Sequence, residues 1–411
     1  MQDRTDVVIA GGGQVGLALA LALKRAAPTI AVVVIDAAPA EARARVGRAS
    51  TIVAGGQRML AELGVWSEVA GAAERVTAME ITDSRTGDTV RPVFLTFPLV
   101  GTADGEAYVV GDGIVCQALA AHAEAAGVEI ITRAAVEDFS VDGGAVKVRI
   151  DSGRVIAARL LVAADGARSR LRAFAGIQWL GRSYGHSCIV ATVAHERPHG
   201  GKAWEHFLPE GPFAALPLAD DAEGRHLSSL VWTETSDVAT RLVSGDALTF
   251  QVELERRFGH RLGAIKVIDR PQAFPLGIYL AREFVRPRFA LAGDAAHTVH
   301  PIAGQGLNLG YRDAAALAEV IVEAYRLGLD IGALTVIERY QRWRRYDTVE
   351  MVLATDGLDR LFSNDNPALR IVRDIGLGLV DRLPELKALF IGNAAGTTGS
   401  DVPRLLRGEA I

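Results

Sequence analysis

Residues 5–24, "TDVVIAGGGQVGLALALALK", decide the fold of this 411-residue chain. The stretch opens with a short apolar run typical of a buried strand and closes with a leucine- and alanine-rich run typical of a helix. Between the two runs, Gly11, Gly13 and Gly16 form a G-x-G-x-x-G motif. Glycines with this spacing permit a tight turn and let backbone N–H groups approach a pyrophosphate, which the N-terminus of the helix attracts.

A second strand pattern makes the glycine motif specific. The stretch "AVVVID" at 31–36 ends in Asp36, about one βαβ unit after the glycines. A carboxylate at that place can bind a ribose hydroxyl of a dinucleotide. The segment therefore predicts dinucleotide binding without choosing between FAD and NAD. The alternative is a glycine turn that holds no nucleotide.

Length and composition narrow the class of protein. A chain this long exceeds one ordinary domain, so we expect two. The formal net charge of −5 argues against a general nucleic-acid binder. The two cysteines, Cys116 and Cys188, lack metal-ligand spacing and cannot form a disulfide framework, so we expect a reducing, cytoplasmic setting.

The apolar N-terminus is not typical of a signal peptide. Asp3 and Asp6 accompany the single Arg4, and glycines interrupt the apolar run. No stretch of about 18 purely apolar residues occurs, so we expect no transmembrane helix. Membrane contact, if the protein makes any, is expected to be peripheral, on the inner face of the cytoplasmic membrane.

Two later stretches repeat the design of a strand that ends in an acid. "RLLVAADGARSRLR" at 159–172 contains Asp165 and Gly166, and "RPRFALAGDAAHTVHP" at 286–301 contains Asp294. An acid at the carboxyl end of a strand suits a turn that holds a polyhydroxylated ligand at the edge of a sheet. Each stretch alone is more typical of an ordinary β-turn, and it is their occurrence together with the glycine motif that favours ligand binding.

The three motifs together resemble those of the single-component, FAD-dependent aromatic hydroxylases of the p-hydroxybenzoate hydroxylase type. More narrowly, "HPIAGQGLNLGYRD" at 300–313 resembles the signature of the ubiquinone-biosynthesis hydroxylases. The resemblance implies an α/β fold with a Rossmann-like FAD-binding domain of the glutathione-reductase type. It also implies an inserted, mostly antiparallel β-sheet domain for the substrate and helices at the C-terminus.

The expected division of the chain follows from that fold. The FAD-binding domain would be discontinuous and take residues 1–72, 105–178 and 276–330. The substrate domain would take 73–104 and 179–275, and the C-terminal helical region 331–411. Within that region the amphipathic stretch 368–392 raises the alternative of contact with a membrane or a partner subunit. The oligomeric state is left open.

The resemblance also implies which residues contact FAD. Asp36 would hold the adenosine ribose, Arg48 the pyrophosphate and ribityl region, and Asp294 a ribityl hydroxyl. Asp165 would support FAD and contact NAD(P)H. The full expected set is Gly11, Gly13, Gln14, Val15, Gly16, Asp36, Arg48, Val136 (through its backbone, at the adenine), Asp165, Gly166, Asp294, Gly306, Leu307 and Asn308.

The loop before the last helical pattern is the expected place of the flavin ring. From about Leu307 the apolar pattern is helical, and a glycine loop that ends at a helix N-terminus offers free N–H groups and partial positive charge. That charge suits the negative charge of reduced flavin. The expected loop residues are His297, His300, Pro301, Gly304, Gln305 and Gly306, with Pro217 and Pro301 in the substrate pocket.

His297 and His300 have side chains that titrate near neutrality, so either could act as an acid or base. The competing interpretation, which we favour, is that both histidines support the loop by hydrogen bonds. We therefore assign neither of them a catalytic role.

The resemblance implies an FAD-dependent monooxygenase that hydroxylates the ring of a polyprenylated phenol or quinone precursor in ubiquinone biosynthesis through a flavin C4a-hydroperoxide. It would consume O2 and take electrons from NAD(P)H, bound transiently, or from another donor. Three alternatives stay open. They are a hydroxylase of another small aromatic substrate, a prenyl-chain reductase of the same fold, and a non-catalytic FAD-containing member of a complex.

Overall fold

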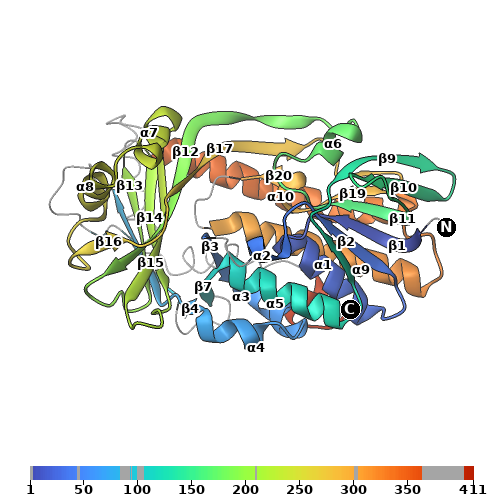
Figure 1. Ribbon diagram of the computed structural model, residues 1–411, viewed down its shortest axis with the longest axis horizontal. Coiled ribbons are helices and arrows are strands. Elements are labelled where there is room, and N and C mark those ends of the chain that lie inside the picture. The colour runs from blue at the N-terminus through green and yellow to red at the C-terminus, as the bar shows by residue number, and fades with distance from the viewer. Residues whose placement is uncertain are drawn as a thin grey trace.

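A computed structural model of the chain describes residues 3–43, 47–83, 93, 95–99, 106–208, 211–299, 304–362 and 402–411. In this part of the chain, strands form one eight-stranded sheet, one nine-stranded sheet and one three-stranded sheet, with helices packed on the two larger sheets (Figure 1). The predicted α/β class is confirmed.

The first sheet contains the N-terminal strand at its centre. β1 (Asp3–Ala10) pairs in parallel with β11 (Val155–Ala163) on one side and β2 (Val32–Asp36) on the other. Parallel strands buried on both faces carry near-continuous apolar runs, and Val7, Val8 and Ile9 are fully buried. The other strands are β8 (Glu129–Thr132), β9 (Val136–Asp142), β10 (Ala145–Ile150), β18 (Val285–Arg286) and β19 (Phe289–Leu291).

Helices α1 (Gln14–Ala26), α5 (Asp112–Ala125), α9 (Gln305–Arg326) and α10 (Leu334–Phe362) build the main core against this sheet. α1 contacts both α5 and α9, and α10 packs on α9. The leucines and alanines of α1 are nearly all buried, which explains why the run reads as apolar on every side. The carboxyl ends of β1, β2, β11 and β19 therefore meet the first turns of buried helices.

The second sheet has the order β20-β17-β12-β15-β14-β13-β5-β6, with β16 paired to β12. Its pairings are antiparallel except that of β13 with β5, which is parallel. The long strands β12 and β17 run across the top of the view in Figure 1 and link the two halves of the molecule. The strands are β5 (Ala78–Asp83), β6 (Leu95–Pro98), β12 (Trp179–His195), β13 (Lys202–Leu208), β14 (Gly211–Leu218), β15 (His226–Thr235), β16 (Ile265–Val267), β17 (Gln272–Ala281) and β20 (His297–Thr298).

The second sheet has two different faces. α7 (Ser236–Ser244) and α8 (Ala247–Phe258) cover one face, where they pack on the side chains of Trp204, Phe213 and Trp232. Residues of opposite parity point to the other face, which lies toward β3 and β7 in Figure 1. We call this the inner face; its residues are Cys188, Val190, Glu205, Phe207, Pro212, Ala214, Leu216, Ser229, Val231 and Thr233.

Shorter elements join the two halves. The three-stranded sheet consists of β3 (Ala49–Val53), β7 (Ala107–Gly111) and β4 (Glu74–Arg75). The remaining short elements are α2 (Ala40–Arg43), α3 (Ala54–Glu62), α4 (Trp66–Val69), η1 (Ala70–Ala72), α6 (Arg170–Phe174), η2 (Gly293–Ala295) and α13 (Arg404–Arg407). The amphipathic stretch 368–392 lies outside the described residues.

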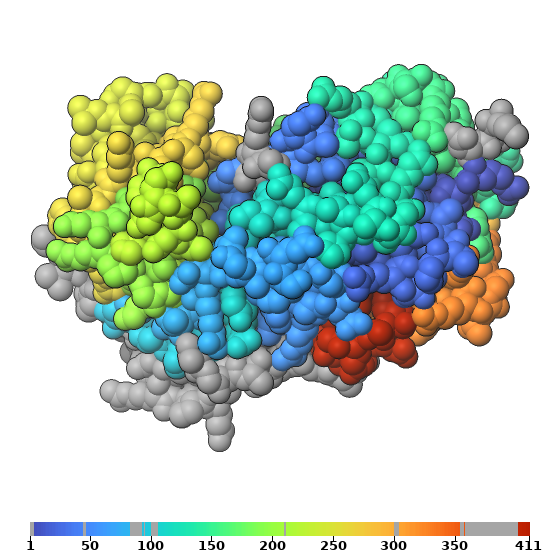
Figure 2. All heavy atoms as spheres, turned by 60° about the horizontal axis from the view of Figure 1, so that its bottom comes forward, coloured from blue at the N-terminus to red at the C-terminus, as the bar shows by residue number. Residues whose placement is uncertain are grey.

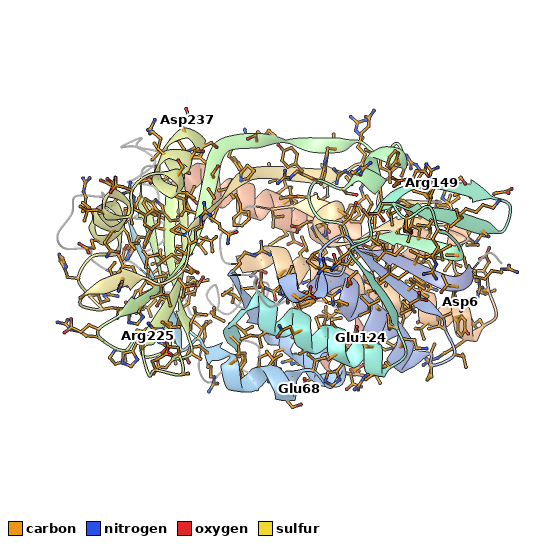
Figure 3. All side chains as sticks on the ribbon, viewed as in Figure 1. Asp6, Glu68, Glu124, Arg149, Arg225 and Asp237 are labelled. Atoms are coloured by element: carbon orange, nitrogen blue, oxygen red, sulfur yellow. The ribbon has the colours of Figure 1, made fainter. Side chains whose placement is uncertain are left out.

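The surface carries charges of both signs. Figure 3 shows Arg225 and Asp237 at the outer edge of the second-sheet half, and Asp6 and Arg149 at the outer edge of the first-sheet half. Within the described ranges, no helix combines the length and apolar character needed to cross a bilayer. Figure 2 shows the surface hollowed between the two halves, with the second sheet and its helices in green and yellow and the first-sheet half in blue and teal.

Candidate functional site

The three glycines of the N-terminal motif have different structural roles. Gly11 has φ +117°, and a Cβ there would lie 2.1 Å from the Ala164 carbonyl oxygen. A Cβ on Gly16 would lie 2.1 Å from the Gly11 oxygen. Gly13 is exposed and a Cβ there would meet nothing within 4 Å, so its space is open. Gly11 and Gly16 are thus required by packing, whereas Gly13 leaves room for a ligand beside the first turn of α1.

That first turn is suited to an anion. Gly13 is the N-cap of α1, and no side chain caps the helix. The first N–H groups of a helix lack intrahelical partners and lie at the positive end of its dipole. A phosphate placed over Gly13 would meet these groups directly.

Asp36 ends β2 beside the glycine turn. A Cβ on Gly12 would lie 2.4 Å from Asp36 Oδ2, so the carboxylate lies over the backbone of the turn. Arg43 Nη2 reaches the same oxygen at 3.3 Å, and the Arg43 side chain is 7% exposed. Arg43 Nε is buried with no hydrogen-bond partner. The sequence did not single out Arg43, because nothing in "AEARARVGRAS" distinguishes it from its neighbouring arginines.

The Asp165 turn is joined to the Asp294 turn by a buried arginine. Arg172 donates through Nη1 to the Ala295 carbonyl oxygen at 2.9 Å and through Nη2 to Ala167 at 3.3 Å. Its guanidinium also stacks 3.6 Å from the centre of the Trp179 ring. Arg172 thus fixes the two acidic turns relative to each other, a role that the sequence did not reveal.

Asp165 and Asp294 share an unusual environment. Both side chains are open to solvent, yet protein surrounds each closely enough that desolvation raises its pKa. Side chains that solvent can reach, but that protein surrounds closely, lie on the floor of a recess. Asp294 follows Gly293, whose φ of +61° turns the chain sharply at the end of β19.

Three distant motifs meet at Val15. A Cβ on Gly293 would lie 3.3 Å from the Val15 side chain, and one on Gly310 would lie 2.5 Å from it. Next to it, the Tyr311 hydroxyl donates to Gln14 Oε1 at 2.5 Å, with both side chains buried. The first turn of α1 and the second turn of α9 are therefore packed together beside the Asp294 turn.

Arg48 lies in the same recess. Its Nε donates to Asp112 Oδ2 at 2.8 Å, and its side chain is 56% exposed while that of Asp112 is 4% exposed. Asp294 and Cys188 are its other electrostatic neighbours. The second oxygen of Asp112 is buried without a partner. Asp112, at the first position of α5, was also missed by the sequence, since "GDG" there is typical of an ordinary helix start.

The N-terminus of α9 forms the far side of the recess. Gly304 caps the helix in the left-handed conformation with φ +63°, so α9 begins at Gln305, slightly before the expected Leu307. Asn308 binds β3: its Oδ1 accepts from Val53 N at 3.1 Å and its Nδ2 donates to the Thr51 oxygen at 2.8 Å. Among the described residues, Val299 is the one neighbour within 4 Å of a Cβ on Gly306, at 4.0 Å.

His297 is buried against the carboxylate of Asp313. Its Nε2 lies 2.6 Å from Asp313 Oδ2, and the two side chains are 1% and 0% exposed. Arg344 Nε donates to the other oxygen of Asp313 at 2.8 Å, and Gly293 N donates to Oδ2 at 2.9 Å. Burial opposes ionisation of Asp313, but His297 and Arg344 outweigh it and lower the pKa of that carboxyl. The arrangement ties the Asp294 turn to α9 and α10 and leaves His297 without access to a substrate.

The remaining predicted residues fall into three groups. Val136, Gly166 and Leu307 lie at the start of β9, after β11 and in the first turn of α9. Pro217 shares the parity of Phe213 and Ala215, so it faces the side of the second sheet covered by helices, away from the recess. His300 and Pro301 lie outside the described residues.

The residues around the recess fit FAD. The open Gly13, the uncapped start of α1 and Arg48 suit a pyrophosphate, and Asp36 suits a ribose. Asp294 and the uncapped start of α9 lie toward the other end, where a flavin's ribityl chain and ring require hydroxyl acceptors and N–H donors. The buried partnerless atoms of Arg43 and Asp112 lie along the same path.

Comparison with known proteins gives the same picture. Residues 4–345 match the family model described as FAD binding domain. The chain is 41% identical over 409 residues to ubiquinone hydroxylase UbiL of Rhodospirillum rubrum, covering 98% of this chain and 92% of that one. It is 36% identical over 402 residues to 3-demethoxyubiquinol 3-hydroxylase of Escherichia coli, covering 95% and 98%.

The fold is also shared with a solved structure. The crystal structure of p-nitrophenol 4-monooxygenase PnpA from Pseudomonas putida superimposes with a TM-score of 0.81 and covers 97% of this chain and 100% of that one. The two chains are 21% identical, so the likeness concerns the fold alone. The expected arrangement of a FAD-binding domain, an inserted β-sheet domain and C-terminal helices is confirmed.

Proposed function

The chain belongs to the FAD binding domain family, and two of its relatives are named as ubiquinone-pathway hydroxylases. From that premise we propose that it hydroxylates the aromatic ring of a polyprenylated phenol or quinone precursor in ubiquinone biosynthesis. It is an FAD-dependent monooxygenase. The observation that carries the substrate assignment is the identity of 41% to the Rhodospirillum rubrum enzyme over 98% of this chain. NAD(P)H is the proposed electron donor.

The residues of the recess would divide the work of holding FAD. Gly13 and the first N–H groups of α1 bind the pyrophosphate, together with Arg48. Asp36 accepts from the adenosine ribose and Asp294 from the ribityl chain. When bound, FAD supplies the activation of O2 and the transfer of one oxygen atom to the ring.

The protein itself positions the reacting groups and excludes water from the site. The His297–Asp313–Arg344 network fixes the Asp294 turn against α9, so the donors at the start of α9 are held in place before any substrate arrives. The inner face of the second sheet is mostly apolar and lies across the recess from α9, which suits a water-excluding lid over a hydrophobic ring. We propose that this sheet and the first sheet mark the substrate and FAD domains.

A polyprenylated substrate dissolves in lipid rather than in water. We therefore propose that the protein works at the inner face of the cytoplasmic membrane through a peripheral contact. The support is the chemistry of the substrate, since each buried CH₂ of a prenyl chain favours an apolar phase by about 0.8 kcal/mol.

The proposal is tested with purified holoprotein, NAD(P)H and a prenylphenol. We expect a yellow flavin spectrum, O2 uptake that rises when the prenylphenol is added, and a hydroxylated product detected by mass spectrometry. Complementation of strains that each lack one ring-hydroxylation step of ubiquinone synthesis would then identify the ring position.

Two other outcomes would each favour one of the alternatives, a prenyl-chain reductase or a non-catalytic protein. If NAD(P)H is consumed without O2 uptake and the prenyl double bonds become saturated, the protein is a prenyl-chain reductase. If flavin is bound but no turnover of any kind occurs, the non-catalytic alternative is supported.

A further inference from the structure

Among the side chains that the structure describes, one acid lies on the inner face of the second sheet. Glu205 occupies the middle of β13, paired with Ala214 of β14 and Ile81 of β5. Its sequence neighbour Trp204 packs on the opposite face with Phe213 and Trp232. Strand alternation therefore turns Glu205 toward the recess side, in a row with Ala214 and Val231.

Glu205 is buried without a partner. The residue is 5% exposed, and no residue of the described ranges makes a hydrogen bond or ion pair with its carboxyl group. Burial alone raises the pKa of Glu205 to about 7. A buried polar group that lacks a protein partner costs free energy, so a site that retains one calls for an explanation.

Two hydroxyl groups on the same face share this condition. Ser229 and Thr233 of β15 are 1% and 3% exposed, and the Oγ of Ser229 and the Oγ1 of Thr233 have no hydrogen-bond partner. They lie one row to either side of Glu205 in the sheet register. Between them are Ala214, Leu216 and Val231, which are only half-buried and leave an apolar surface open.

The other two acids of this sheet whose side chains the structure describes are paired. Glu234 binds Arg257 at 2.6 Å, and Glu80 binds Lys202 at 2.8 Å and also Arg261. Both lie on the face covered by α7 and α8 or at its margin, by parity with Trp232 and Trp204. Among these described acids of the sheet, Glu205 is therefore the one that lacks a partner.

The geometry points to Glu205 as the residue that anchors the ring hydroxyl of the substrate by accepting its hydrogen bond, and that selects neutral phenols over aromatic acids. The assignment rests on the proposed function and names the substrate class for it. The inner face supplies apolar contact for a prenylated ring, while Ser229 and Thr233 offer hydroxyls to its oxygen substituents. A substrate carboxylate would meet a buried acid instead of a cation, which is unfavourable.

Binding to holoprotein tests the assignment without turnover. The probes are 2-prenylphenol, which is neutral, and 4-hydroxybenzoate, which is anionic; the readout is the Kd from perturbation of the flavin absorbance. At pH 8.5, Glu205→Gln is expected to raise the Kd of 2-prenylphenol about tenfold, because a carboxylate is the stronger acceptor. At pH 5.5 the two proteins should bind it almost equally, because the Glu205 carboxyl is then uncharged. Glu205→Leu should lose affinity at both pH values.

For the anionic probe, the substitution should change the Kd in the opposite direction. Glu205→Gln is expected to tighten binding of 4-hydroxybenzoate at pH 8.5, because the repelling charge is gone. Glu80→Gln serves as the matched control, since it changes a carboxyl to an amide on the other face of the same sheet and should leave both affinities unchanged. Equal Kd values for wild type and Glu205→Gln at pH 8.5, or failure of the wild type to bind 2-prenylphenol, would overturn the assignment.

Thermal unfolding gives a readout independent of any substrate. A carboxyl whose pKa is raised on folding destabilises the protein progressively as pH rises through about 7. The melting temperature of the wild type should therefore fall more between pH 5.5 and 8.5 than that of Glu205→Gln. Parallel curves would contradict the burial of an unpartnered carboxyl. If neutral phenols bind through Glu205 but are not hydroxylated, the anchoring stands and the proposed function fails.

Discussion

Replacing Asp313 by asparagine is expected to lower the free energy of unfolding by about 3–5 kcal/mol, the cost of removing one partner from a buried ion pair. Asp313 is fully buried between His297 and Arg344, and neither of these side chains reaches solvent. The asparagine keeps the size of the side chain, so packing is preserved and only the charge is lost. Urea denaturation of the apoprotein, followed by far-UV circular dichroism, measures the change.

The effect should depend on pH. His297 and Arg344 hold the pKa of Asp313 below its ordinary value against the effect of burial, so its stabilisation is present at neutral pH and is lost as pH falls through the folded-state pKa. The difference in the free energy of unfolding between the wild type and Asp313→Asn should therefore become smaller at acidic pH. Asp221→Asn, which removes a surface pair with Arg225, is the control and should cost far less than Asp313→Asn, because solvent screens the pair. A similar small cost for Asp313→Asn at pH 7 would show that the network does not hold the Asp294 turn.

The second large effect is expected at the glycine turn, where two alanine substitutions should separate folding from cofactor binding. Gly13→Ala should fold normally, because φ is −77° and a Cβ meets no atom of the described residues within 4 Å. Its methyl group would occupy the space assigned to the pyrophosphate, so the Kd for FAD should rise at least about tenfold, in keeping with the cost of overpacking a close contact.

Gly11→Ala should fail at an earlier step. Its Cβ would lie 2.1 Å from the Ala164 oxygen at a φ of +117°, so the apoprotein itself should be strongly destabilised. Titration of each apoprotein with FAD, with urea denaturation alongside, distinguishes the two cases. Gly71→Ala, which has open space and an ordinary φ, is the control. If Gly13→Ala bound FAD with normal affinity, the assignment of the pyrophosphate to this turn would be wrong.

The fold was predictable because its signals are local. The run of strand, glycines and helix at 5–24 has one conformation that satisfies the glycine spacing, and the structure places β1, the turn and α1 there. Asp36, the acid at the end of β2, could be identified from its distance in sequence to the glycine motif, which is about one βαβ unit. The same local logic holds for Gly293 and Gly304, whose positive φ values require glycine.

Partners far apart in sequence could not be predicted. Arg172 binds Ala295, and Asp112 binds Arg48, across more than 60 positions of sequence in each case. Arginine and aspartate are common surface residues, so nothing in their immediate context marks these as buried or paired. His297 was interpreted as a loop support without its partner being named, because Asp313 lies two helical turns inside α9.

The face of a strand depends on register, which the sequence leaves open. A shift of one residue in β14 would move Pro217 to the inner face and Leu216 away from it. The pairing with β15 settles the matter, since Pro217 lies opposite Ser228 and on the face covered by helices. Glu205 was overlooked for the same reason, because "WEHFL" does not say which of its polar residues points inward.

The most direct test of the account is the source of the oxygen atom. Holoprotein, NAD(P)H and a prenylphenol would be incubated under oxygen-18 gas, and the product examined by mass spectrometry. A monooxygenase should place one oxygen-18 atom in the new ring hydroxyl. A product whose hydroxyl comes from water, or whose only change is reduction of the prenyl chain, would contradict the proposed function.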